Sequence, residues 1–327
     1  MSRAFEDRHG RRPRKLRVSL TDRCNFRCGY CMPEQPQWAP KDQLLTADER
    51  LRLIRLFVER AGVRSIRLTG GEPLLAPELD GLIARLRGDP LTAKLRLSIT
   101  TNAQLLHRRL PGLVAAGLDD INVSLDALEP ARFDAMTRTR HRLPAVLRGV
   151  EAACEAGIPV KINAVIVRGQ NEDQILPMLR WAMDRDLVLR FIEFMPLEGG
   201  ALWRRERVFS EAELIDHVTG EFGAPVSLGA DGPASYYALP DGGRFGVIPT
   251  VTRPFCGDCD RMRLTATGAL YTCLFASRGT ELRELLRGGV DDEALVAHLA
   301  AASRAKPDGY AQTGAVERPI TMHGLGG

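Results

Sequence analysis

The stretch Cys24-Asn25-Phe26-Arg27-Cys28-Gly29-Tyr30-Cys31 places three cysteines within eight residues, with the spacing C-x3-C-x2-C. Three thiolates hold three irons of a cubane [4Fe–4S] cluster and leave the fourth iron without a protein ligand. An open iron is a reaction site, because a small molecule with an amine and a carboxylate chelates it. This arrangement suits one-electron cleavage of S-adenosylmethionine (SAM), which is radical cofactor chemistry.

Structural zinc and disulfide bonds are the other common uses of clustered cysteines. Structural zinc takes four ligands, usually two C-x2-C pairs or one such pair with a His pair. Here the group stops at three cysteines, and no His lies within ten residues. Disulfides need an oxidising compartment, and the odd count of seven cysteines argues against a disulfide framework. An iron–sulfur cluster is therefore the favoured interpretation.

A second group of three cysteines, Cys256, Cys259 and Cys273, has the spacing C-x2-C-x13-C and no adjacent His. A second [4Fe–4S] cluster is favoured, whose open iron would bind a substrate through a ring nitrogen or oxygen. One zinc site shared by both groups, with two spare cysteines, stays open as the alternative. The seventh cysteine, Cys154, is expected to be a small buried residue of a helix.

Length and composition indicate a soluble globular protein. The 327 residues allow one large domain or a domain with a smaller partner, and 44% are hydrophobic and 26% charged. The net charge of +4 suits a phosphate-bearing small molecule as well as nucleic acid. No apolar run approaches the roughly 18–20 residues of a membrane span, and the basic N-terminus lacks the apolar segment of a signal peptide. A cytoplasmic location is expected.

Short β-like runs alternate with helical patterns along the first part of the chain. Six strands are predicted at residues 16–20, 65–69, 95–101, 120–126, 159–167 and 187–195. Helices are predicted at 47–61, with Thr46 as N-cap, and at roughly 77–88, 105–117, 143–157 and 172–184. Six β/α units imply a parallel sheet with right-handed crossovers. They are too few for a closed eight-stranded barrel, so the predicted fold is α/β, a partial (open) β/α barrel.

The composition changes after Met195, and three regions are predicted. Residues 1–14 would form a solvated basic arm and residues 15–195 the barrel. Residues 196–327 would form a smaller α+β region that carries the second cysteine group and ends in a Gly-Gly tail. Within it, a helix starts at Ser210, short strands lie at 235–239 and 244–247, and helices lie at roughly 280–289 and 292–305.

Cations occur within strands that are otherwise rich in Ile, Val and Leu. They are Arg17, Arg67, Lys161 and Arg190. Arg261 and Arg263 follow the second cysteine pair, on one face of an extended segment. A cation in such a strand needs an anion or water, and Arg is suited to bidentate phosphate contacts. Ion pairs with Asp or Glu stay open for each residue. Together the group favours a triphosphate held by side chains, since the chain has no P-loop sequence.

Polar residues gather at the C-terminal ends of the predicted strands, where β/α barrels carry out their chemistry. Gly70-Gly71-Glu72 follows the second strand, Thr100 lies in the third and Ser124 in the fourth. Two glycines let a backbone approach a ligand closely, and Glu72 is able to accept a hydrogen bond from an ammonium group.

The first cysteine group, with an aromatic residue before its last cysteine, resembles the signature of the radical SAM superfamily. The longer stretch from Val18 to Pro33 is similar in particular to the MoaA family of GTP 3′,8-cyclases of molybdenum cofactor biosynthesis. The likeness covers nearly the whole chain, through Gly70-Gly71-Glu72-Pro73, the paired cysteine groups with Arg-x-Arg, and the terminal Gly326-Gly327. Ala103 stands where the family usually has Gly.

The resemblance implies a role for each matching residue. Cluster ligands would be Cys24, Cys28, Cys31, Cys256, Cys259 and Cys273. Contacts to SAM would come from Tyr30, Gly71, Ser124 and Met195. GTP would be bound by Arg17, Arg67, Thr100, Lys161, Arg261 and Arg263. Arg17, Arg261 and Arg263 would also act in catalysis beside the first three cysteines, by steadying charge on an intermediate. The terminal diglycine would reach into the active site.

The implied activity is that of a lyase that converts GTP to (8S)-3′,8-cyclo-7,8-dihydroguanosine 5′-triphosphate, the first step of molybdenum cofactor biosynthesis. The implied cofactors are two [4Fe–4S] clusters and SAM, whose 5′-deoxyadenosyl radical abstracts hydrogen from C3′ of GTP. The implied partners are a low-potential donor of the flavodoxin or ferredoxin type and a downstream pyranopterin-forming enzyme. The chain would be a monomer or homodimer, with no nucleic-acid or membrane partner.

Two other function classes are considered. A radical SAM enzyme that modifies a peptide would also carry an auxiliary cluster, but usually with many more C-terminal cysteines. A zinc-stapled nucleic-acid-binding protein would bind DNA or RNA with a steep salt dependence. The mild charge and the repeated β/α pattern argue against it.

Overall fold

The computed structural model describes residues 3–197, 203–310 and 320–326. Six parallel strands form the centre of its sheet, in chain order from β1 to β6. They are β1 Lys15–Ser19, β2 Ser65–Thr69, β3 Arg96–Thr101, β4 Asp120–Ser124, β5 Val160–Ile166 and β6 Val188–Glu193. Each strand pairs with the next in parallel register. The predicted order of β/α units is confirmed.

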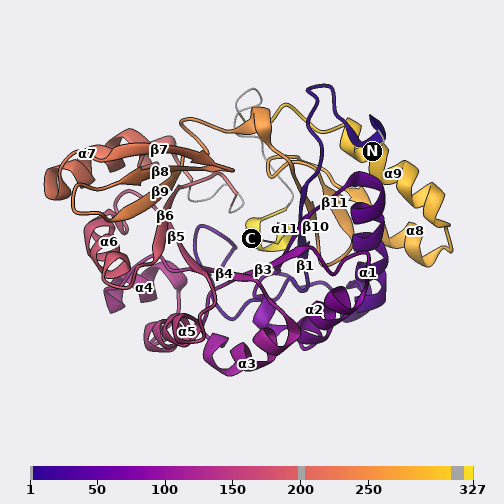
Figure 1. Cartoon of the computed structure of the whole chain (residues 1–327), viewed down its shortest axis with the longest axis horizontal. Coiled ribbons are helices and arrows are strands. Elements are labelled where there is room, and N and C mark those ends of the chain that lie inside the picture. Colours follow the sequence, from indigo (N-terminus) through magenta and orange to yellow (C-terminus); the bar gives the residue numbers. More distant parts are fainter. Residues whose placement is uncertain (1–2, 198–202, 311–319, 327) are drawn as a thin grey trace.

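Helices connect these strands and lie on the outer side of the curved sheet (Figure 1). They are α1 Ala47–Leu56, α2 Leu79–Gly88, α3 Leu106–Ala116, α4 Pro130–Thr137, α5 Leu143–Glu155 and α6 Ile175–Met183. The predicted cap of α1 is a full capping box: Thr46 Oγ1 accepts from the N–H of Glu49, whose carboxylate accepts from the N–H of Thr46. Of these six helices, α4 is the one that the sequence analysis did not predict.

Successive side chains of each strand point to opposite faces of the sheet, so one face packs against the helices and the other carries polar side chains. Leu16 and Val18 of β1 and Ile66 and Leu68 of β2 are fully buried against the helices. Burying each such side chain contributes about 1.5–3 kcal/mol. The positions between them, among them Arg17 and Arg67, face the inside of the curve.

Strands from the C-terminal region extend this sheet at both edges. Strand β10 (Arg261–Leu264) pairs in parallel with β1, and β9 (Arg244–Ile248) pairs in parallel with β6. The further strands are antiparallel: β7 Val226–Asp231, β8 Ala234–Ala238, β11 Ala269–Tyr271 and β12 Thr280–Glu281. Among the described residues the sheet ends at β12 and β7 and does not close, as expected for an open barrel.

The C-terminal helices are α7 Glu211–Phe222, α8 Arg283–Arg287, α9 Asp292–Arg304 and α11 Met322–Leu325. Ser210 caps α7 as predicted. The region predicted as a helix at 280–289 holds the short strand β12 before α8. Figure 1 shows α11, at the C-terminal end, inside the curve of the sheet. The boundary at residue 195 stays a prediction, and the strands beyond it continue the sheet of the first six.

The N-terminal arm is packed rather than solvated, so that prediction is wrong. Phe5 is only 2% exposed, and its carbonyl oxygen accepts a hydrogen bond of 2.6 Å from Ser303 Oγ in α9. Asp7 and Arg11 are buried and form an ion pair of 2.6 Å. The hydrogen bond to Phe5 therefore holds the arm against α9, while the ion pair links two residues within the arm.

The expectation for Cys154 is also wrong, because this residue is exposed. It lies on the solvent side of α5, next to the fully buried Ala153. None of the described helices combines the length and the apolar character that a membrane crossing needs.

Candidate active site

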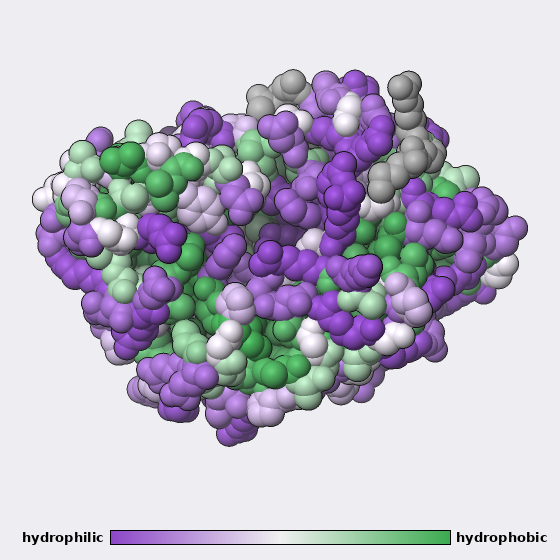
Figure 2. Space-filling view, viewed as in Figure 1, coloured by the Kyte–Doolittle hydropathy of each residue, from purple (hydrophilic) through white to green (hydrophobic). Residues whose placement is uncertain are grey.

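A cavity opens inside the curve of the sheet, at the C-terminal ends of the central strands. Its lining includes Arg17 of β1, Arg67 of β2, Thr100 of β3, Ser124 of β4 and Arg190 of β6. Figure 2 shows a hollow near the centre of this face, surrounded mostly by hydrophilic side chains. This is the position where a β/α barrel is expected to place its active site.

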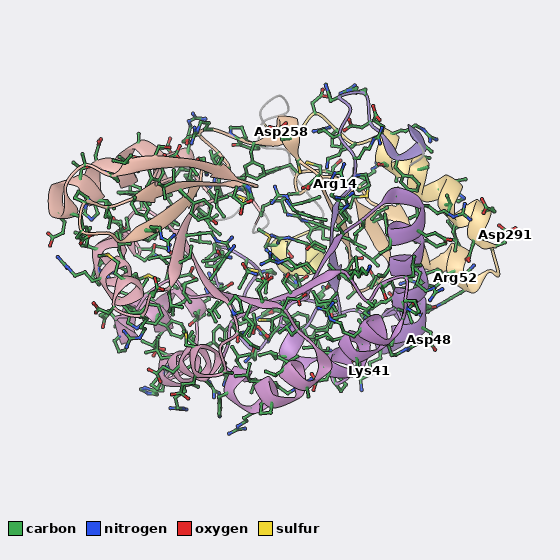
Figure 3. All side chains as sticks on the ribbon, viewed as in Figure 1. Arg14, Lys41, Asp48, Arg52, Asp258 and Asp291 are labelled. Atoms are coloured by element: carbon green, nitrogen blue, oxygen red, sulfur yellow. The ribbon has the colours of Figure 1, made fainter. Side chains whose placement is uncertain are left out.

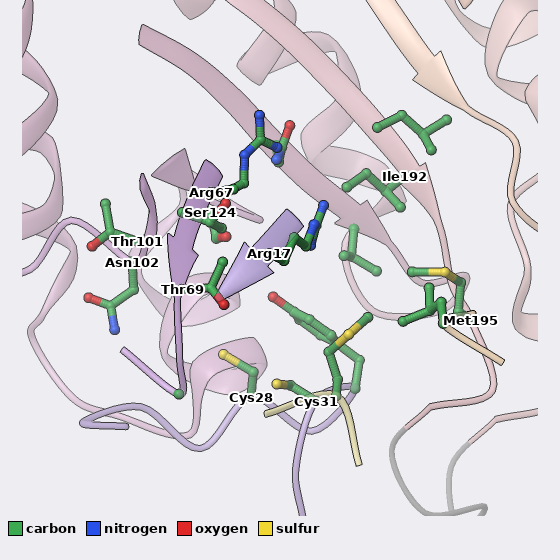
Figure 4. Close-up of a pocket in the computed structure, with 18 of the residues that line it drawn as sticks. Arg17, Cys28, Cys31, Arg67, Thr69, Thr101, Asn102, Ser124, Ile192 and Met195 are labelled. Carbon is green, nitrogen blue, oxygen red and sulfur yellow. The ribbon is translucent and has the colours of Figure 1, made fainter. Parts of the chain in front are cut away.

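The first cysteine group lines one end of this cavity, with all three of Cys24, Cys28 and Cys31 in the lining. Figure 4 shows Cys28 and Cys31 on one side of Thr69, and Arg17 and Arg67 on the other. The cysteine end and the arginine end therefore belong to one space.

The turn after β2 holds the cysteine loop through its backbone. The N–H of Gly71 donates to the carbonyl oxygen of Thr21 (2.6 Å), and the N–H of Glu72 donates to that of Arg23 (2.8 Å). A Cβ at Gly71 would lie 2.3 Å from the Arg23 oxygen, so a side chain does not fit there. Gly71 lines the cavity, as predicted for a SAM contact. Its more immediate role, which the sequence did not reveal, is to let this turn touch the cysteine loop.

The environment of the first three thiols suits a positively charged metal group. Burial raises the pKa of Cys24 to about 11, and it raises the pKa values of Cys28 and Cys31 still further from the ordinary value. The nearby thiols, Glu72 and Asp126 raise these pKa values as well. Three thiolates in this place need a compensating cation, which iron supplies. The donor set fits a [4Fe–4S] cluster with one open iron.

Tyr30 and Asp126 form a buried pair beside the cysteines. The Tyr30 hydroxyl donates to Asp126 Oδ2 (2.7 Å), and Asp126 Oδ1 accepts from the N–H of Val165 (2.8 Å). Burial raises the pKa of Asp126 to about 6, against these two hydrogen bonds. Tyr30, Ser124 and Met195, the remaining residues predicted to contact SAM, all line the cavity. The sequence interpretation assigned no role to Asp126, although it follows Ser124 at the end of β4.

Glu72 joins the ends of two neighbouring strands. Its carboxylate accepts from the N–H of Leu74 (3.0 Å), the hydroxyl of Thr101 (2.6 Å) and the N–H of Asn102 (2.7 Å). Burial raises its pKa to about 7, while these hydrogen bonds lower it. Since Glu72 also lines the cavity, part of its acceptor capacity stays available for a ligand.

Arginines converge at the other end of the cavity. In the sheet register Arg17 lies opposite Arg67 on one side and Arg263 on the other, and Arg190 and Arg261 line the same space. Burial lowers the pKa of Arg17 well below its ordinary value, and the charges of the four other arginines lower it further. Burial likewise lowers the pKa of Arg67 to about 10. So many buried cations favour a bound anion.

Polar side chains complete this end. The Thr100 hydroxyl oxygen is buried and has no hydrogen-bond partner among the described residues. The Arg190 guanidinium donates to Asn163 Oδ1 (2.9 Å) and to Asn122 Oδ1. Lys161, predicted to bind GTP, is not part of the cavity lining. It lies opposite Asn122 in the register, on the same face of β5 as Asn163 but two residues nearer the N-terminal end of the strand.

The second cysteine group lies next to the cavity but outside its lining. Cys256, Cys259 and Cys273 do not line the cavity themselves, whereas their neighbours Phe255 and Leu274 do. The three thiols influence one another, because the charges of Cys259 and Cys256 add to burial in raising the pKa of Cys273. Burial also raises the pKa of Cys259, but the charges of Arg261 and Lys306 outweigh it and the pKa falls to about 6.

No three His, Cys, Asp or Glu side chains within residues 3–197, 203–310 and 320–326 converge on a point that would hold a single metal ion. The donor set of the second group, three neighbouring thiols beside two cations, fits a larger cluster with delocalised charge.

The C-terminal tail returns to the cysteine end of the cavity. Met322 lines the cavity, and the Thr69 hydroxyl donates to the carbonyl oxygen of Gly326 (2.9 Å). His323 is buried against Trp38, with ring centroids 5.6 Å apart, and its Nδ1 lies 2.7 Å from Thr321 Oγ1. Gly326 thus contacts Thr69, which lines the cavity, but is not itself part of the lining, and Gly327 lies outside the described residues. The reach of the diglycine into the active site stays a prediction.

Family models match most of the chain. Residues 18–182 match the Radical SAM superfamily, and residues 187–312 match Molybdenum Cofactor Synthesis C. A relative in Mycobacterium tuberculosis named GTP 3′,8-cyclase 2 is 46% identical over 318 residues, covering 93% of this chain and 86% of its own length. A relative in Streptomyces coelicolor named GTP 3′,8-cyclase is 47% identical over 297 residues, covering 88% and 85%.

Solved structures share the fold at low sequence identity. SuiB of Streptococcus suis bound to precursor peptide SuiA has a TM-score of 0.60 and 17% identity, over 95% of this chain and 76% of SuiB. SuiB bound to S-adenosylmethionine has a TM-score of 0.59 and 18% identity, over 90% and 68%. These values show a common architecture. The family models and the two named relatives go further: the chain belongs to the GTP 3′,8-cyclase family of the radical SAM superfamily.

Proposed function

We propose that this protein converts GTP to (8S)-3′,8-cyclo-7,8-dihydroguanosine 5′-triphosphate, the first step of molybdenum cofactor biosynthesis. The observation that carries the proposal is the single cavity with three cysteines at one end and five arginines, Arg17, Arg67, Arg190, Arg261 and Arg263, at the other. A radical-generating cofactor and a triphosphate substrate would meet in this space. Relatives that are 46–47% identical carry the name of this activity.

The arginine end would hold the triphosphate. Arg17, Arg67 and Arg263 are neighbours across three adjacent strands, so they offer guanidinium groups to one row of phosphate oxygens. The Thr100 hydroxyl, which has no partner among the described residues, would donate to the substrate. Lys161 does not line the cavity and would add charge rather than a direct contact.

The cysteine end would hold the first cluster and SAM. Cys24, Cys28 and Cys31 would bind the cluster, and Tyr30, Gly71, Ser124 and Met195 would line the SAM site. When bound, this cluster supplies the electron that cleaves SAM to methionine and a 5′-deoxyadenosyl radical. The protein contributes the fixed position of Tyr30, set by Asp126, and a Glu72 carboxylate already oriented by three donors.

Cys256, Cys259 and Cys273 would hold the second cluster and face the guanine end of GTP. Arg261 and Arg263 continue from this cysteine pair into the cavity, so they connect the second cluster with the triphosphate site. Arg17, Arg261 and Arg263 would also steady negative charge that develops during the reaction. Alanine variants that lose only GTP affinity, with unchanged turnover at saturating GTP, would contradict that catalytic role.

The proposed surroundings follow from the chemistry. The first cluster requires a low-potential electron donor of the flavodoxin or ferredoxin type, and the product requires a pyranopterin-forming enzyme downstream. A reducing, cytoplasmic location is proposed, because cysteines that hold iron–sulfur clusters must stay out of disulfide bonds. A monomer or a homodimer is proposed as the working state.

The test is an anaerobic assay of the purified, reconstituted full chain. Iron and zinc are counted, the protein is incubated with SAM, a reductant and GTP, and the products are analysed by mass spectrometry. Two four-iron clusters correspond to roughly eight irons per chain. We expect this count together with 5′-deoxyadenosine and a new isomer of GTP. SAM cleavage with GTP unchanged would reject the substrate, and zinc without iron would reject the radical chemistry.

A further inference from the structure

A buried lysine that does not line the cavity contacts the second cysteine loop, residues 256–261. Lys306 is 6% exposed and follows α9. Its Nζ donates to the carbonyl oxygens of Cys259 (2.6 Å) and Arg261 (3.0 Å), and it lies 3.6 Å from Cys259 Sγ. The cation therefore reaches both the backbone and the sulfur of one proposed cluster ligand.

A second buried cation reaches the same loop from the N-terminal arm. The Arg11 guanidinium donates to the carbonyl oxygens of Cys256 and Pro307, both at 2.8 Å. The arm then runs alongside the loop, where the N–H of Arg14 donates to the carbonyl oxygen of Asp260 (2.9 Å). Figure 3 labels both Arg14 and Asp258 in the upper half of the view. The N-terminal arm and the segment after α9 thus meet around Cys256 and Cys259.

The two cations differ in their charge balance. Arg11 forms a buried ion pair with Asp7, so its positive charge is neutralised locally. The hydrogen bonds of Lys306 go to two carbonyl oxygens and one sulfur. The ammonium group of Lys306 therefore lies within hydrogen-bonding distance of the sulfur of a proposed cluster ligand, Cys259.

We propose that Lys306 is a positioning residue of the second cluster, whose ammonium group hydrogen-bonds to the Cys259 sulfur and raises the reduction potential of that cluster. Reduction adds negative charge to a cluster, and a nearby buried cation stabilises the reduced form. Arg11 fixes the backbone of the same loop without adding net charge. The inference rests on the second cluster of the proposed function.

The experiment compares three variants of the reconstituted full chain. Lys306→Met removes the charge and keeps the length of the side chain, while Lys306→Arg keeps the charge. Lys41→Met removes an exposed lysine elsewhere on the surface and is the control. Iron is counted for each variant, and the midpoint potential of the second cluster is measured by a redox titration followed by electron paramagnetic resonance. SAM cleavage without GTP reports separately on the first cluster.

We expect Lys306→Met to shift the midpoint potential of the second cluster to a more negative value, or to lose that cluster and keep about four irons. Outer-shell residues of metal sites typically affect metal affinity by about 10–100-fold. Lys306→Arg should keep the cluster, with a midpoint potential closer to that of the unchanged protein. SAM cleavage should stay unchanged in all three variants.

Full iron and an unchanged potential in Lys306→Met would overturn the proposal. Equal damage in Lys306→Met and Lys306→Arg would also overturn it, because the shape of lysine rather than its charge would then matter. Failure of the proposed GTP chemistry is read from product analysis and leaves the redox comparison intact.

Discussion

The Thr69 hydroxyl at the end of β2 donates a hydrogen bond of 2.9 Å to the carbonyl oxygen of Gly326, 257 residues further along the chain. Gly326 has a φ of +83°, a conformation that favours glycine. A Cβ there would lie 2.6 Å from Thr69 Oγ1 and 3.0 Å from Ser19 Cβ. The tail therefore closes on the ends of β1 and β2 only with glycine at this position.

Gly326→Ala should displace the tail from the cavity. Because small displacements of reacting groups are costly, we expect turnover of GTP to fall by about tenfold or more, with SAM cleavage retained. Steady-state product analysis measures the effect. Gly81→Ala is the matched control: nothing lies within 4 Å of a Cβ there, so it should leave activity unchanged. Equal turnover of GTP by the two variants would contradict a role of the C-terminal tail in the reaction.

Gly71→Ala should act on the first cluster instead. A Cβ 2.3 Å from the carbonyl oxygen of Arg23 forces the turn after β2 away from the cysteine loop. We expect iron to fall from roughly eight to roughly four per chain and SAM cleavage to be lost. Iron analysis of the reconstituted variant checks this, again beside Gly81→Ala. A full iron content would mean that the loop adapts to the extra methyl group.

The repeated β/α pattern predicted the six central strands because that pattern is local. Glu193 at the end of β6 faces away from the cavity, because Arg190 and Ile192 line the cavity and side chains alternate along a strand. Its carboxylate accepts from the N–H groups of Val251 and Thr252, both at 2.8 Å. These partners lie 58 and 59 residues further along the chain, so no local pattern predicts the contact.

Contacts between distant segments were beyond the sequence for the same reason. The placement of Arg263 beside Arg17 requires β10 to pair with β1, and no local pattern announces that pairing. Lys306 and Arg11 belong to no motif, so nothing marked them as neighbours of Cys259 and Cys256. Motif spacing did identify the cysteines and the arginines, since their chemistry needs particular residue types close together.

Arg17→Met should stabilise the protein and weaken GTP binding. Arg17 is buried among Arg263, Arg67, Arg261 and Arg190, so its removal relieves repulsion between like charges. We expect Tm to rise by about 2 °C or more, and the affinity for GTP to fall by about tenfold or more, the effect of losing a charged hydrogen bond. Thermal scans with and without GTP measure both.

The control for this variant is Arg132→Met. Arg132 forms an exposed ion pair of 3.0 Å with Asp173 and does not line the cavity. Surface ion pairs contribute only about 0–1 kcal/mol, so this variant should change neither Tm nor GTP affinity appreciably. A fall in Tm for Arg17→Met, with GTP affinity kept, would contradict an anion site at the arginine end.

Glu72 should make stability depend on pH in a defined direction. Burial raises the pKa of Glu72 from 4.5 to about 7 in the folded protein, so folding favours its protonated form. The penalty for ionising Glu72 is absent below the unfolded-state pKa, grows as pH rises, and is complete above about 7. As the pH rises from 6 to 8, the ionisation of Glu72 should lower the free energy of unfolding by about 1 kcal/mol.

The matching experiment compares the unchanged protein with a variant that cannot ionise at this position. Glu72→Gln removes the ionisation, but its amide keeps only one oxygen: if that oxygen accepts from Thr101 and Leu74, the amide N–H₂ opposes the N–H of Asn102. Its Tm is therefore expected to be lower overall, yet to decline less between pH 6 and pH 8 than that of the unchanged protein. Parallel declines in the two proteins would show that Glu72 is already ionised at pH 6, held so by its three hydrogen-bond donors.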